Sequence, residues 1–121
     1  MHSAGVILQK DPARAEILVS EVKSVCDLVL IAQSAHEIQT LASQFPIQIA
    51  VVDLGLVSLQ EVSRLRGQLG MEIVCTHHTP DEDMWTGALE AGAHDCCFDD
   101  DGPAICRGIR QTSTTLNRAA S

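Results

Sequence analysis

The sequence has 121 residues and a formal net charge of −8, which favours one domain with a single hydrophobic core and an acidic surface. Such a surface repels phosphate backbones and anionic lipids, so we expect no direct binding to nucleic acid or to membranes. The odd number of cysteines, five, favours reduced thiols in a cytoplasmic protein over a disulfide framework.

Five short apolar segments bounded by turn residues predict β-strands at residues 5–9, 28–32, 47–53, 72–76 and 95–98. Each is followed by a segment whose apolar residues recur at helical spacing. Each helix also has a start signal in the form of an N-cap, a capping box or an early proline. In chain order the signals are Asp11-Pro12, Ser34 with Glu37, Ser58 with Glu61, Thr79 with Glu82, and Asp101-Gly102-Pro103.

This alternation predicts an α/β protein, with a parallel sheet covered by helices on both faces, forming a single domain over residues 1–121. Right-handed crossovers make the flavodoxin-like (βα)5 arrangement, with strand order 2-1-3-4-5, the usual solution at this length. Residues 112–121 lose the helical pattern, and we interpret them as a frayed tail or the start of a linker.

The carboxyl ends of parallel strands meet at one edge of the sheet, and α/β proteins of this kind bind their ligands there. We therefore expect a functional site at this edge. The chain order brings to it Gln9, Lys10, Asp11, Asp53, Thr76, His77, His78, Asp99 and Asp100.

The stretch AVVDL, which ends a buried strand at Asp53, resembles the third strand of the receiver domains of bacterial two-component response regulators. In that family the strand ends in the phosphorylated aspartate. IVCTHHTPDEDMWTGALEAGAHDCCF is similar to the following strand, helix and Gly-Ala turn, with Thr76 at the conserved Ser/Thr position. KDPARAEIL resembles the opening of the first helix. The resemblance covers nearly the whole chain and implies a signalling domain. The sequence has no Ser-His-Asp set, P-loop or Gly-rich dinucleotide loop, so we expect no enzymatic activity.

Several positions depart from the family pattern. The acidic pair that holds Mg²⁺ in receivers falls on Gln9 and Lys10, and Asp11 is expected to cap the helix. The lysine that contacts the phosphoryl oxygens falls on Asp99, and the aromatic switch residue falls on Cys96. Phosphoryl transfer to an aspartate needs a divalent cation, so these changes predict a degraded phosphorylation site and no cofactor.

Compared with the family pattern, a lysine replaces an acid at position 10 and an acid replaces the lysine at position 99. This exchange suggests that the Lys10 ammonium occupies the place of the metal. In this hypothesis Lys10 forms an ion pair with Asp53, Asp99 or both, and Asp53 is permanently neutralised. The domain then acts through protein–protein contact without phosphorylation. The alternative is a working receiver, phosphorylated on Asp53 in a phosphorelay, with Asp11 or Asp99 helping to bind Mg²⁺.

A third hypothesis is a metal- or redox-responsive module that uses Cys75, His77 and His78. Adjacent histidines on an extended segment are expected to point in opposite directions. The chain also lacks Cys-x2-Cys and His-x3-His spacings. We therefore expect no metal site.

The resemblance also implies a partner surface on the fourth helix, fifth strand and fifth helix, where receivers form dimers or bind other proteins. Trp85, Arg107 and Arg110 fall on this surface, and Trp and Arg are frequent interface anchors. The pattern leaves open whether Trp85 is exposed there or packs onto the sheet.

Overall fold

The computed structural model describes the backbone of residues 2–120 and the side chains of residues 4–112. Within these residues, strands and helices alternate as the apolar patterns predict. In chain order the elements are β1 (His2–Leu8), α1 (Pro12–Val22), β2 (Cys26–Ala32), α2 (Ala35–Ala42), β3 (Ile49–Asp53), α3 (Leu59–Leu69), β4 (Glu72–His77), α4 (Glu82–Glu90), β5 (Asp95–Phe98) and α5 (Gly102–Ala120).

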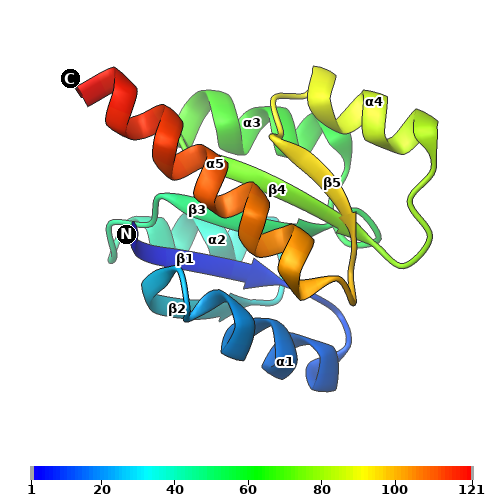
Figure 1. Ribbon diagram of the computed structural model, residues 1–121, viewed down its shortest axis with the longest axis horizontal. Coiled ribbons are helices and arrows are strands. Elements are labelled where there is room, and N and C mark those ends of the chain that lie inside the picture. Colours follow the sequence, from blue (N-terminus) through cyan, green and yellow to red (C-terminus); the bar gives the residue numbers. More distant parts are fainter. Residues whose placement is uncertain (1, 121) are drawn as a thin grey trace.

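The strands form one parallel sheet in the order β2-β1-β3-β4-β5, which confirms the flavodoxin-like prediction (Figure 1). The strand ends differ slightly from the expected ones. β2 begins early, at Cys26, because Cys26 pairs with His2 of β1. β3 begins late, at Ile49, because the N–H of Ile47 donates to the carbonyl of Phe45 in a turn. β1 is shifted toward the N-terminus, and β4 is one residue longer than expected.

Helices cover both faces of the sheet, and side chains that alternate along the strands fill two apolar layers. Leu8 of β1 belongs to the layer shared with α2, α3 and α4, whereas its neighbour Ile7 belongs to the layer shared with α1 and α5 (Figure 1). Every residue of β3 is buried, as expected for a parallel strand covered on both faces. Polar side chains that could form a site are therefore concentrated at the ends of the strands.

Most helices begin where the sequence predicts, but α4 does not. Asp81, and not Thr79, caps α4, and its carboxylate accepts the N–H of Met84 at 2.8 Å. The difference has a physical reason, since aspartate is a better N-cap than threonine. The helices α1, α2, α3 and α5 begin directly after the expected residues Asp11, Ser34, Ser58 and Asp101, each of which accepts a backbone N–H from the first turn.

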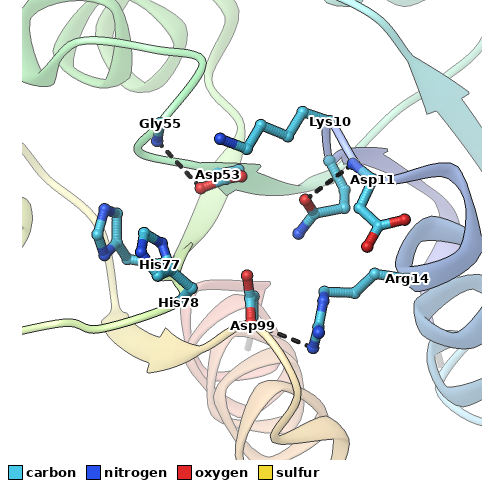
Figure 2. A pocket seen from close by; sticks show the side chains of 9 residues that line it. Lys10, Asp11, Arg14, Asp53, Gly55, His77, His78 and Asp99 are labelled. Atoms are coloured by element: carbon cyan, nitrogen blue, oxygen red, sulfur yellow. Dashed lines mark hydrogen bonds and ion pairs between the residues drawn. The ribbon is translucent and has the colours of Figure 1, made fainter.

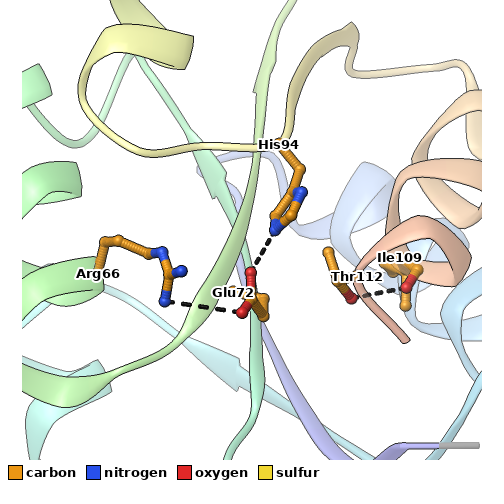
Figure 3. Close-up of polar contacts among 5 residues, drawn as sticks. All are labelled: Arg66, Glu72, His94, Ile109 and Thr112. Atoms are coloured by element: carbon orange, nitrogen blue, oxygen red, sulfur yellow. Dashed lines mark hydrogen bonds and ion pairs between the residues drawn. The ribbon is translucent and has the colours of Figure 1, made fainter. Parts of the chain in front are cut away.

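The backbone of α5 continues as a helix through Ala120, beyond the point where the apolar pattern ends. Buried Thr112 donates its hydroxyl to the carbonyl of Ile109 at 2.7 Å, so its polar group is satisfied within the helix (Figure 3). Ser121 lies outside the described residues, and the start of a linker there stays a prediction. No helix among residues 2–120 combines the length and the apolar character that crossing a membrane requires.

A buried carboxylate, Glu72 at the start of β4, contacts α3 and the loop before β5, at the edge of the sheet opposite the carboxyl ends of the strands (Figure 3). Its Oε1 lies 3.6 Å from Nη1 of Arg66 on α3, and its Oε2 contacts Nε2 of His94 just before β5. The Glu72 side chain is only 6% exposed. Removing the partners of a buried charge is costly, so this contact should stabilise the fold.

We expect Glu72→Gln to lower the free energy of unfolding by about 1–3 kcal/mol, because it removes the carboxylate oxygens that contact Arg66 and His94. Urea denaturation measures this change. The matched control is Glu90→Gln on the exposed surface of α4, which should stay within about 0.5 kcal/mol of the native chain. Equal stability of both variants would show that the Glu72 contacts contribute nothing.

Candidate functional site

An open pocket of about 310 Å³ lies at the carboxyl ends of the strands, where the sequence predicts a site (Figure 2). The structure adds Arg14 and Gly55 to the predicted set, while Thr76 and Asp100 do not line the pocket. The lining residues are Gln9, Lys10, Asp11, Arg14, Asp53, Gly55, His77, His78 and Asp99.

Asp53 lies at the end of β3 in register with Thr76 of β4 and is 4% exposed. Its Oδ1 accepts the N–H of Gly55 at 3.0 Å, and its carbonyl accepts the N–H groups of Leu56 and Val57. The side chain therefore caps the turn that follows β3. Within the described residues no cationic side chain forms an ion pair with it.

The predicted ion pair of Lys10 is not formed among the described residues. The Lys10 side chain extends toward Asp53 in Figure 2, but its ammonium makes no ion pair with Asp53 or Asp99. Asp99 instead pairs with Arg14, whose Nη1 lies 3.2 Å from Asp99 Oδ1. The reason is geometric, because the first turn of α1 directs Arg14 across the pocket toward the end of β5 (Figure 2).

No sequence motif singles out Arg14 as part of the site. The sequence could have indicated Arg14 only through its position in the first turn of α1, the helix that begins at the edge of the sheet where the site is expected. A long side chain there can reach a neighbouring strand end, although the sequence does not specify which one.

The remaining side chains from the end of β1 make local contacts. Gln9 is 5% exposed, and its Oε1 accepts the N–H of Asp11 at 3.2 Å. Asp11 in turn caps α1 by accepting the N–H of Ala13 at 3.0 Å, as predicted. Two buried polar atoms have no partner within the described residues, the Nε2 of Gln9 and the Oγ1 of Thr76.

These residues do not fit the magnesium site that the fold implies. Mg²⁺ requires oxygen ligands in octahedral geometry, and the two residues that follow β1 supply the amide of Gln9 and the ammonium of Lys10 in place of an acidic pair. The two further carboxylates are engaged, Asp11 with the helix start and Asp99 with Arg14. Among the described side chains no three His, Cys, Asp or Glu residues are arranged to hold a metal ion.

The expectation that His77 and His78 point apart is wrong. Their rings stack with centroids 4.5 Å apart, and both line the pocket (Figure 2). Strand alternation ends with β4 at His77, so it no longer directs the His78 side chain. The Nδ1 of His77 accepts the N–H of Thr79 at 3.0 Å, which leaves its Nε2 for the proton of the neutral ring. Cys75 is fully buried in the layer shared with α2, α3 and α4, and it does not line the pocket.

All five cysteines are free and buried. Burial raises the pKa of the Cys75 thiol to about 12 and that of Cys26 to about 11. Burial, followed by the nearby Asp95 carboxylate, raises the pKa of Cys97 to about 12. Reactive cysteines have lowered pKa values, so these thiols have the character of core residues and not of redox sensors.

The predicted partner surface carries two exposed aromatic side chains. Trp85 is 46% exposed, and its indole Nε1 donates to Asp95 Oδ1 at 3.2 Å, which links α4 to β5. Phe98, at the end of β5, is 50% exposed and was not expected to contribute. Arg107 and Arg110 are also exposed, on α5. An apolar strand pattern could not show that Phe98 faces solvent, because that depends on β5 being an edge strand.

We expect the native thiols to resist alkylation. At pH 8 a thiol with a pKa of about 12 is ionised in only about one molecule in ten thousand, and burial also blocks access. Intact-mass measurements with iodoacetamide should show slow labelling of the folded chain and labelling of all five cysteines after unfolding. Rapid labelling of folded Cys75 would instead support the redox hypothesis.

A scan against protein-family models finds no match to this chain, and a search of curated proteins finds none either. Solved structures do resemble it. A response regulator from Thermotoga maritima is 16% identical, with 92% of this chain and 97% of that one covered and a TM-score of 0.81. A two-component response regulator from Clostridium difficile is 14% identical, with coverage of 99% and 100% and a TM-score of 0.78.

The signal receiver domain of a DNA binding response regulator from Colwellia psychrerythraea is 14% identical, with coverage of 93% and 98% and a TM-score of 0.77. At such identities the likeness shows the fold. The chain has the fold of the receiver domains of response regulators.

Proposed function

We propose that this chain is a receiver-like signalling module of the two-component type that acts through protein–protein contact without phosphorylation of Asp53. The observation that carries the proposal is the Arg14–Asp99 ion pair across the pocket, at 3.2 Å. This ion pair joins α1 to the end of β5 through two charged side chains of the protein. In this proposal the module is cytoplasmic, has no enzymatic activity and needs no cofactor.

The charges of the pocket oppose phosphorylation. Phosphorylation would replace the single negative charge of the Asp53 carboxylate with a phosphoryl group of about two negative charges, in a pocket that Asp99 also lines. Phosphoryl transfer relies on metal ions and fixed cations to offset this charge. Lys10 is the remaining unpaired cation among the described lining residues, and it replaces an acidic side chain that would hold the metal.

The proposed partner surface consists of Trp85, Phe98, Arg107 and Arg110 on α4, β5 and α5. Trp85 bonds to Asp95 of β5, the strand that ends in Phe98, and α5 packs against the same strand. Exposed tryptophan and arginine side chains are typical anchors of protein interfaces. The partner is a second copy of the chain or another protein.

A working receiver is the second candidate, because two features of a phosphorylation site are retained. Asp53 ends β3, and Thr76 lies beside it in register with an unpartnered hydroxyl. That hydroxyl could donate to a phosphoryl oxygen on Asp53. The same chain would then need Asp11 or Asp99 to leave its present partner and bind Mg²⁺.

We expect no phosphorylation of the native chain by acetyl phosphate with Mg²⁺, because the pocket lacks an oxygen donor set for the metal. Intact-mass spectrometry measures this directly. A gain of one phosphoryl mass that disappears in Asp53→Asn would establish the working receiver and end the proposal.

The triple variant Gln9→Asp, Lys10→Asp, Asp99→Lys should gain Mg²⁺-dependent phosphorylation, because it restores an acidic pair and a cation at the strand ends. The same variant with Asp53→Asn is the control and should stay unmodified. If the triple variant folds but remains inert, the three positions are not what prevents phosphorylation.

We expect the native chain to self-associate through the proposed surface. Sedimentation velocity over a concentration series should show dimers, and the double variant Trp85→Gln, Phe98→Gln should be monomeric. The control variant Ile17→Gln removes another exposed apolar side chain, on α1, and should associate as the native chain does. A native chain that stays monomeric at all concentrations would rule out the homodimer and leave a different protein as the partner.

A further inference from the structure

The pocket contains one cation and one carboxylate whose charges are not paired within the described residues. Arg14 and Asp99 neutralise each other, and Asp11 caps α1. Lys10 and Asp53 both line the pocket and lie near each other in Figure 2, yet no ion pair joins them. Each therefore retains capacity to bind a group of opposite charge.

Gln9 supplies a third unfilled contact. Its side chain is 95% buried and lines the pocket, its Oε1 accepts the N–H of Asp11, and its Nε2 has no partner. A buried donor without an acceptor is costly, and proteins normally satisfy such a group with water or a ligand. The orphaned amide therefore indicates that an acceptor group belongs beside Lys10.

The charge balance selects the class of ligand. A dianion would be attracted by Lys10 but repelled by Asp53 and Asp99, whereas a divalent cation would meet the Lys10 ammonium. A molecule with one negative and one positive group matches Lys10 and Asp53 together. The volume of about 310 Å³ suits a small molecule, and the stacked rings of His77 and His78 form one wall.

We propose that this pocket binds a small zwitterion that carries a carboxylate and an ammonium group, as an α-amino acid does. The carboxylate accepts from Lys10 and from Nε2 of Gln9, and the ammonium donates to the carboxylate of Asp53. The inference rests on the proposed function, because a phosphoryl group on Asp53 would occupy the place of the ammonium.

Amide NMR spectra of the full chain, titrated separately with each protein amino acid, test the proposal. At least one amino acid should shift the side-chain amide signals of Gln9 in a saturable way. The corresponding carboxylic acid without the amine, and the amine without the carboxylate, should each bind at least about ten-fold more weakly.

The variants Lys10→Met and Asp53→Asn should each weaken binding at least about ten-fold. The controls Lys23→Met and Asp27→Asn remove the same charges from exposed positions outside the pocket and should bind as the native chain does. Two outcomes overturn the inference: no amino acid shifts the Gln9 signals, or the pocket variants bind as tightly as the controls.

The proposed function is tested on the same sample by intact mass after acetyl phosphate and Mg²⁺. Phosphorylation of Asp53 would refute the proposed function. If the chain is not phosphorylated and no amino acid shifts the Gln9 signals, only the inference of a zwitterion site is refuted.

Discussion

The parallel register of the sheet is the constraint on which the site depends. Because β1, β3, β4 and β5 run in the same direction, their carboxyl ends meet at one edge. The register places Asp53 beside Thr76, and it brings residues separated by some ninety positions, Gln9 and Asp99, to one pocket. The aliphatic core holds these ends in place, so the chemistry of the edge is decided by which side chains the sequence puts there.

Those side chains include the cations Lys10 and Arg14 among three carboxylates. The resemblance implies that acidic side chains surround a bound metal ion in a receiver with a complete phosphorylation site. Here Arg14 pairs with Asp99 and Asp11 caps the start of α1, while Lys10 lies where the resemblance implies an acid. The ion pair is about one third exposed on the arginine side, so its effect on stability is modest, and its main consequence is to position charge. The proposed function follows from this arrangement, because most of the charged lining side chains already pair with one another or with the backbone.

Local patterns predicted the fold and most helix starts because they depend on short-range chemistry. Apolar runs followed by Asp11-Pro12 or by Ser58 with Glu61 specify where a strand ends and a helix begins. The pattern also predicted the edge at which the structure has an open pocket, and Asp53 is one of the residues that line it.

The pairing of charges could not be predicted in the same way. Whether Lys10 or Arg14 reaches Asp99 depends on the direction of α1 relative to β5, which no local signal encodes. The stacking of His77 and His78 likewise depends on where β4 ends. Exposure of Phe98 follows from the position of β5 at the sheet edge, a property of the whole topology.

The most direct measurement is a crystal structure of the chain grown with magnesium and beryllofluoride, which mimics a phosphorylated aspartate. The central claim predicts that Arg14 remains on Asp99, that Lys10 stays at the pocket wall and that Asp53 carries no fluoride complex. A magnesium ion bound by Asp53 together with Asp11 or Asp99, with beryllofluoride on Asp53 and Arg14 displaced, would contradict it.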